Sequence, residues 1–405
     1  MRRSFKFLLR PTVGQEQALG EMLRDHCSLY NAALENRRNS WRDRRVGVTY
    51  NQQAADLKHI RAFDPDQARW SYCSQQDTLR RLDKAFAAFF RRVKTGETPG
   101  YPRFKGAGVF DTVTWPTDGD GCRWDSTPTS GGDTRVRLQG VGHVKVHQHR
   151  PVLGRVKTVS VKREGKRWYV ILSCDDVPAE PLPVTGAIVG IDMGIAHFYT
   201  THVGEHEPNP RLEKAAAERL ACAQRALSLF PRTRKRSERT VKHRRAVEKV
   251  SNLYRKVRLQ RLDHAHKTAL NLVRQYDVIA HEDLKIRNMV RAPKPKPDPD
   301  QPGAFLPNGA AAKAGLSRAI KDAGWGVFLD FVAYKAESAG RTIIRVDARN
   351  TSRTCPQEDC GHVATENRVT QEKFQCVACG FTDHADRVGA LNVAIRAGLA
   401  HPLTN

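Results

Sequence analysis

Four cysteines near the C-terminal end constrain the fold more than any other feature of the sequence. They form two pairs, Cys355 with Cys360 and Cys376 with Cys379, and a glycine follows each pair. Two such pairs about 15 residues apart are typical of a zinc ribbon, in which four thiolates surround one Zn²⁺. Because four protein ligands complete a tetrahedral site, this pattern predicts a structural zinc and not a catalytic one.

Two histidines are alternative ligands for the same ion. His362 follows the first cysteine pair, and His384 follows the second. The other five cysteines of the chain are scattered and are predicted to be small buried residues.

The charge of the chain indicates a polyanionic partner. The 405 residues include 68 Lys and Arg against 43 Asp and Glu, a formal net charge of +25. Such an excess favours nucleic acid over a membrane surface, and it gives no sign of a small-molecule substrate. No apolar run approaches the roughly 20 residues of a membrane span, and the basic N-terminus lacks a signal-peptide core. We therefore expect a cytoplasmic protein without disulfides.

The hydrophobic period changes several times along the chain. A short alternating strand ends at Pro11, and Thr12 with Gln15 forms a capping-box pattern before a helix. Residues 12–95 have helical periodicity, and residues 105–180 alternate with the period of strands. Helices are expected again over 210–275 and over 313–338. The proline-rich segment 290–312 is expected to be mobile or ordered only on binding.

Basic side chains gather at three places and are candidate nucleic-acid contacts. The helix at 77–96 places Leu79, Leu82, Phe86, Phe89, Phe90 and Val93 on one side and its basic residues on the other. A second group lies in the segment "GYPRFKG", and a third in a basic run that begins at residue 232. The predicted contacts are Arg80, Arg81, Lys84, Arg91, Arg92, Arg103, Lys105, Arg234, Lys235 and Arg236.

Three acids stand where predicted strands end or a helix begins. Asp192 interrupts the apolar stretch "IVGIDMGIAHFYT", and Glu282 ends the apolar run "VIAHE". Asp386 opens a helix with a small apolar inner face. A strand-end aspartate can simply turn the chain, but three such acids also form a hard-oxygen site for Mg²⁺. Two such ions can activate water and stabilise the leaving 3′-oxygen of a phosphodiester.

The order of several short motifs gives the chain a family resemblance. In sequence order they are "LYNAALENR", "GYPRFKG", "VGIDMGIAHF", "HEDLKIRNM", "DAGWGVFLDFVAYKAESAGRTII", "TSRTCPQEDCGH", "CVACGF" and "HADRVGALNVA". Together they resemble the TnpB proteins of insertion-sequence transposons, relatives of the type V CRISPR effector nucleases. The resemblance runs nearly from one end of the chain to the other.

The resemblance implies an α+β multidomain fold. It consists of a wedge-like β-barrel with an inserted helical recognition lobe, followed by an RNase-H-like RuvC nuclease domain with an inserted zinc ribbon. The family's Asp–Glu–Asp triad falls on Asp192, Glu282 and Asp386. The implied bounds are 1–11 and 105–182 for the barrel, 12–104 for the lobe, 186–349 and 382–405 for the nuclease domain, and 350–381 for the ribbon.

The sequence departs from the family pattern at two places. The first cysteine pair has four intervening residues where the family more often has two. After the last acid, Val388 and Gly389 stand where the family commonly has Asn and Ala. The second departure predicts the loss of a hydrogen bond that orients Asp386, and with it slower cleavage or a different metal preference.

The function implied is RNA-guided DNA cleavage. A transposon-encoded guide RNA and the target DNA would be the partners, and the protein would read a short motif beside the target. The cofactors would be Mg²⁺, as two ions on the three acids, and Zn²⁺ on the four cysteines. Three alternatives remain: a compact type V CRISPR effector, a guide-independent transposase, and a nuclease-dead RNA-guided repressor. Transposases usually order their acids Asp, Asp, Glu, and dead relatives usually lack one acid.

Overall fold

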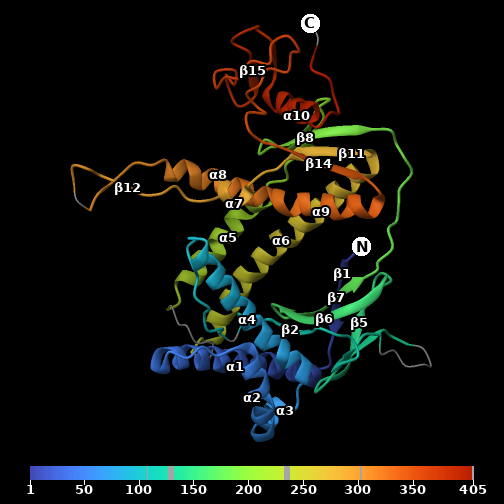
Figure 1. Cartoon of the computed structure of the whole chain (residues 1–405), viewed down its shortest axis with the longest axis vertical. Coiled ribbons are helices and arrows are strands. Elements are labelled where there is room, and N and C mark those ends of the chain that lie inside the picture. The colour runs from blue at the N-terminus through green and yellow to red at the C-terminus, as the bar shows by residue number, and fades with distance from the viewer. Residues whose placement is uncertain (107, 126–131, 232–237, 302, 404–405) are drawn as a thin grey trace. The chain divides into compact units, whose positions relative to one another are not determined.

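The chain folds into two compact units, Met1–Pro178 and Ala179–Asn405. Both units contain helices and strands, which gives a multidomain α+β architecture (Figure 1). None of the helices in the described residues is long and apolar enough to cross a membrane. The computed structural model describes residues 1–106, 108–125, 132–231, 238–301 and 303–403.

An antiparallel sheet of seven strands forms the first unit's framework, in the order β2-β6-β7-β1-β5-β4-β3. Its inward residues alternate along each strand, as in β1, where Phe5, Phe7 and Leu9 are buried. Strands β2 and β3 lie at the two ends of the hydrogen-bonded order, so the closed barrel stays a prediction. The strands are β1 Arg3–Arg10, β2 Thr112–Trp115, β3 Cys122–Arg123, β4 Arg135–Leu138, β5 Gly142–His147, β6 Arg155–Glu164 and β7 Arg167–Asp175.

Four helices are inserted between β1 and β2. The predicted capping box is present, because Thr12 accepts from the backbone of Gln15 while the Gln15 side chain accepts from Thr12. The helices share one apolar core with the sheet, to which Leu19, Tyr30 and Leu79 contribute. The four are α1 Val13–Arg44, α2 Tyr50–Phe63, α3 Pro65–Ala68 and α4 Tyr72–Lys94.

A five-stranded sheet of order β10-β9-β8-β11-β14 organises the second unit. Its centre is parallel: β11 pairs with β8 on one side and with β14 on the other. In this register His281 lies opposite Ile191, so Glu282 and Asp192 follow at the same edge of two neighbouring strands. The strands are β8 Ile188–Met193, β9 His197–Thr201, β10 His206–Pro208, β11 Val278–Glu282 and β14 Thr342–Val346.

Helices cover both faces of this sheet, with α6 and α9 on one face and α10 on the other (Figure 1). The helix expected over 313–338 is two helices, because Gly324 between them has φ +74° and ends α8. The helices are α5 Leu212–Ser228, α6 Val241–Gln275, α7 Ile286–Met289, α8 Ala310–Ala323, α9 Trp325–Ala339 and α10 Ala385–Arg396.

Two small antiparallel pairs complete the second unit. Strands β15, Lys373–Gln375, and β16, Thr382–His384, lie directly before α10. Strands β12, Lys296–Pro297, and β13, Phe305–Leu306, pair within the proline-rich segment. The composition of that segment did not predict this pairing.

Candidate nuclease and metal sites

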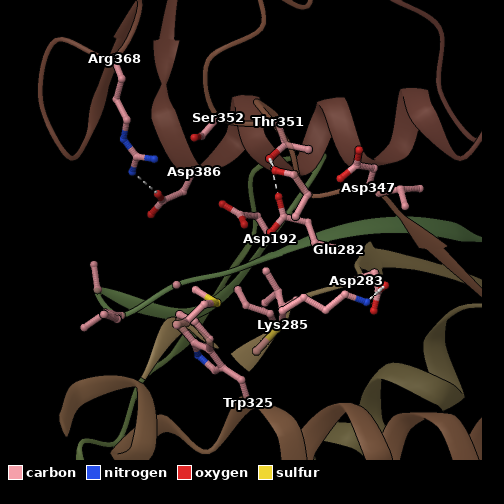
Figure 2. Close-up of a pocket in the computed structure, with 18 of the residues that line it drawn as sticks. Asp192, Glu282, Asp283, Lys285, Trp325, Asp347, Thr351, Ser352, Arg368 and Asp386 are labelled. Carbon is pink, nitrogen blue, oxygen red and sulfur yellow. Dashed lines mark hydrogen bonds and ion pairs between the residues drawn. The ribbon is translucent and has the colours of Figure 1, made fainter. Parts of the chain in front are cut away.

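The pleat of two strands brings the three predicted acids together. Gly190 and Ala280 face α10, and side chains two residues apart on a strand share a face. Asp192 and Glu282 therefore lie on the side of the sheet that α10 covers, and Asp386 projects from the first turn of that helix. All three line one pocket of about 850 Å³, and Figure 2 shows their carboxylates grouped at its upper edge.

Close packing of α10 on β8 explains two glycines near the site. A Cβ at Gly190 would lie 2.7 Å from the Ala394 backbone nitrogen, so only glycine lets the helix approach this closely. A Cβ at Gly389 would lie 2.7 Å from Oδ2 of Asp192. Gly389, one of the departures from the family pattern, thus leaves room for the Asp192 carboxylate beside the helix.

Glu282 is held in place by a residue that the sequence analysis did not single out. The Thr351 hydroxyl, just beyond β14, donates to Oε1 of Glu282, and both residues are buried. The Asn392 side chain of α10 donates in turn to the carbonyls of Thr351 and Thr354, each at 2.8 Å. Only its position in the sequence could have indicated this role, because Thr351 follows β14, the strand that pairs with β11. This network connects the Glu282 carboxylate to the helix that carries Asp386.

Thr351→Val should reduce cleavage by about 10- to 100-fold, a range typical of losing a group that orients a metal ligand. The valine keeps the shape of threonine but removes the donor, so the buried Glu282 carboxylate loses its partner. Mn²⁺ binding, measured by electron paramagnetic resonance, should weaken in parallel. Thr351→Ser keeps the hydroxyl and should restore both properties. Equal losses in the Val and Ser variants would mean that the residue matters only for packing.

Asp386 is held from two sides. Arg368, from the segment between the cysteine pairs, donates to Oδ1 of Asp386 at 3.4 Å (Figure 2). The backbone nitrogen of Asp386 donates to Nδ1 of His384, which caps α10. Val388 points away from the acids into a cluster with Cys355 and Phe374. Arg368, which the sequence analysis did not identify, thus contacts the Asp386 carboxylate, and the effect of Val388 and Gly389 on cleavage stays a prediction.

Burial makes the carboxylates hard to ionise without a cation. Burial, and then the nearby carboxylates of Glu282 and Asp386, raise the pKa of Asp192 well above its ordinary value. Burial also raises the pKa of Glu282, although the Thr351 hydrogen bond opposes the shift. A divalent cation among these oxygens would compensate both effects, and carboxylate oxygens are ligands that Mg²⁺ prefers. In the described residues, however, the ligand atoms of the three acids do not all lie within 4.8 Å of one another, so the chemistry of the donor set fits the ion while its spacing is wider than that of the cysteines.

The cysteines come together as the sequence predicted. In the described part of the chain they are the only group of at least three His, Cys, Asp or Glu residues whose ligand atoms all lie within 4.8 Å of one another. The Sγ atoms of Cys355 and Cys379 are 3.6 Å apart, as are those of Cys360 and Cys376. A tetrahedral zinc with bonds of about 2.3 Å would separate its sulfurs by about 3.8 Å.

The thiols of the group differ in how readily they ionise. Although burial opposes it, backbone hydrogen bonds from Cys379 and Ala378 lower the pKa of Cys376 to about 7, whereas burial raises the pKa of Cys355. Neither His362 nor His384 belongs to the close group, and His384 is engaged in capping α10. The four cysteines alone can therefore hold the ion.

The predicted nucleic-acid contacts have different surroundings. Arg80 lies over the Tyr50 ring, while Arg81 lies over Phe110 and donates to the Thr112 carbonyl, so both also stabilise the fold. The other described contacts are exposed or half-buried: Lys84, Arg91, Arg92, Arg103 and Lys105. Arg234, Lys235 and Arg236 lie outside the described residues.

Comparison with known proteins identifies the class. Residues 158–292 match the OrfB_IS605 family, described as "Probable transposase", and residues 325–393 match the "Cas12f1-like, TNB domain". "Putative RNA-guided DNA endonuclease InsQ" of Escherichia coli K12 is 30% identical over 395 residues, which cover 96% of this chain and 91% of that protein. A protein of Streptomyces pristinaespiralis with the same designation is 29% identical over 99% of this chain and 90% of its own length.

A shorter match reaches the CRISPR effectors. The CRISPR-associated endodeoxyribonuclease Cas12f1 of Sulfoacidibacillus thermotolerans is 42% identical over 64 residues, 16% of this chain and 15% of that protein. The nearly full-length relatives are RNA-guided DNA endonucleases by name. The chain belongs to this group, the TnpB family.

Proposed function

We propose that the chain is an RNA-guided DNA endonuclease that hydrolyses DNA in the pocket lined by Asp192, Glu282 and Asp386. One observation carries the proposal. Three acids from segments far apart in the sequence meet in one pocket of a chain that belongs to the TnpB family. The two nearly full-length relatives are named for the same activity.

The residues of the pocket have distinct roles in this proposal. Asp192, Glu282 and Asp386 would hold the Mg²⁺ ions, two in this proposal, which would supply activation of a water and charge stabilisation for the leaving 3′-oxygen. Thr351 orients the Glu282 carboxylate, and Arg368 keeps Asp386 directed toward the pocket. Arg345 also lines the pocket and provides positive charge for the phosphates of the DNA strand, whereas the charge of Lys285 is offset by Asp283.

The remaining parts of the chain bind and position the nucleic acids. We propose that Cys355, Cys360, Cys376 and Cys379 bind one structural Zn²⁺. The strands of the first unit act as the wedge domain and helices α1 to α4 as the recognition lobe. A transposon-encoded guide RNA neutralises much of the net charge of +25 and pairs with the target strand, while the protein reads a short adjacent motif. On its target the protein is associated with the nucleoid.

The alternatives fit fewer observations. A compact CRISPR effector shares the chemistry, but the matching Cas12f1 segment spans only 64 residues. A nuclease-dead repressor does not require three acids grouped in a pocket, and a guide-independent transposase does not require a guide-binding lobe.

Exchange of the guide tests the function directly. The protein purified with its RNA should cleave DNA that matches the guide, and a new guide sequence should redirect cleavage to the new match. Cleavage rates on matching and non-matching targets, before and after the exchange, provide the measurement. Removal of the RNA should stop cleavage. If cleavage persists without RNA or ignores the guide, sequence recognition belongs to the protein alone.

A further inference from the structure

The C-terminal end of α4 leaves aromatic side chains uncovered on the first unit. The helical pattern predicted that Phe90 and Val93 would lie on the buried side, but they are 61% and 52% exposed. Tyr101 and Phe104, from the segment that follows the helix, are 46% and 48% exposed. Large apolar groups gathered in this way on a basic surface indicate a binding site.

The segment that carries Tyr101 and Phe104 is fixed to α1. The Asn31 side chain accepts from the Lys105 backbone nitrogen at 2.8 Å and donates to the Lys105 carbonyl at 2.9 Å. The Cys27 thiol donates to the same carbonyl at 3.3 Å. These bonds hold the backbone of the segment in one position, so its exposed rings belong to a built site.

The orientation of the Tyr101 ring is also fixed. The rings of Phe86 and Phe89 meet it nearly at right angles, at centroid distances of 5.6 and 5.3 Å. Beside it lies a pocket of about 380 Å³, which we name the aromatic cup. Its lining residues are Leu34, Arg38, Tyr101, Pro102, Arg103 and Phe104.

The positive charge around the aromatic cup favours one class of partner over another. Arg38 and Arg103 are exposed, and neither forms an ion pair within the described residues. The last turn of α4 adds Arg91, Arg92 and Lys94. An apolar protein partner would bury these guanidinium groups without counter-charges, which is unfavourable. A nucleotide supplies a flat ring for the aromatic side chains and a phosphate for the arginines.

We propose that the aromatic cup binds an unpaired nucleobase, stacked on Tyr101 and Phe104, with the neighbouring phosphates on Arg38 and Arg103. The proposal rests on the proposed function for the source of the base, which is the guide RNA or the DNA target. The inference that a base and its phosphates bind here rests only on the residues of the aromatic cup. Stacking on an aromatic face tolerates any base, so the cup would hold a nucleotide without reading its identity.

Photo-crosslinking tests the proposal on the complex as purified. One arm uses a guide RNA that carries 4-thiouridine, and the other a DNA target that carries 4-thiothymidine. Mass spectrometry should find a crosslinked peptide that contains Tyr101 or Phe104 in one arm, and that arm identifies the source of the base. Tyr101→Ala with Phe104→Ala should abolish the crosslink, and Tyr101→Phe should keep it. A crosslink in neither arm would overturn the proposal.

Salt dependence separates stacking from phosphate binding. With 12-nucleotide oligo-dU or oligo-dT as the probe, Tyr101→Ala should weaken binding about 5- to 100-fold at every salt concentration. Arg103→Gln should instead lower the slope of log affinity against log salt by about 1. Phe63→Ala is the control, since Phe63 is 88% exposed on α2 and does not line the cup.

An abasic probe provides the decisive comparison. If Tyr101→Ala weakens abasic and normal oligonucleotides equally, no base is stacked there and the proposal is wrong. Guide exchange on the parent protein is a separate experiment, because it tests the proposed function and not the aromatic cup. Guide-independent cleavage would refute the proposed function, while the crosslink and the abasic comparison would still decide whether the cup binds a base.

Discussion

Asp192→Asn, Glu282→Gln and Asp386→Asn should each reduce DNA cleavage by a factor on the order of 10³ or more. Each change keeps the shape of the side chain but removes a negative oxygen donor from a hard-cation site. Single-turnover cleavage of guide-matched DNA in Mg²⁺ provides the measurement. Binding of RNA and of target DNA should stay within a few-fold of the parent, because the amides still fit the pocket.

A neighbouring acid supplies the matched control. Asp283 lines the same pocket, but its carboxylate accepts from Lys285 and its side chain is partly exposed. Asp283→Asn should therefore cleave at a rate close to that of the parent. Near-parental cleavage by all three triad variants would show that the chemistry occurs elsewhere.

The Asp192→Asn variant should also fold at least as stably as the parent when no metal is present. The pKa of Asp192 is raised in the folded protein, so folding favours its protonated form. Its contribution to stability is greatest below the unfolded pKa of about 3.9 and is lost as the pH rises through the folded pKa. At neutral pH in a chelator the raised pKa of Asp192 therefore costs stability. Asp192→Asn removes that cost, and thermal melting in EDTA should show an equal or higher midpoint.

The sequence predicted that acids from distant segments would share one pocket, because strand geometry is regular. An apolar run that ends in an acid places that acid at the edge of a sheet, and the period of two fixes the face on which it lies. Asp192 and Glu282 could be placed in this way, and the cysteine spacing defined the close group of thiols. The Thr12 capping box was also readable, since it depends on residues only three positions apart.

Features that depend on tertiary contacts could not be predicted from the sequence. Gly324 breaks the helix predicted over 313–338, because its left-handed backbone ends α8 close to the Arg261 side chain. The hydrogen bonds that orient Glu282 and Asp386 come from Thr351 and Arg368, which are distant in the sequence. Likewise, helical periodicity placed Phe90 on the apolar side of its helix. It could not show that the core covering this side ends before Phe90, which is exposed.

Cys376→Ser should remove most of the zinc and loosen the helix that carries Asp386. We expect about one Zn²⁺ per parent chain by elemental analysis, and well under half of that in the variant. The binding free energy of a structural zinc, on the order of 10 kcal/mol, also stabilises the fold of the segment that binds it. Cys222→Ser is the control, since Cys222 is an exposed cysteine on α5, outside the close group.

The effect should reach the proposed nuclease site through packing. Cys355, Phe374 and Cys376 share one apolar cluster with Ala385 and Val388 of α10. Those two helix residues flank Asp386, so loss of the metal should raise amide hydrogen exchange over the first turn of α10 and lower cleavage as well. Unchanged zinc content in Cys376→Ser would remove this cysteine from the ligand set. Zinc loss with unchanged exchange at α10 would mean that the ribbon and the nuclease site are independent.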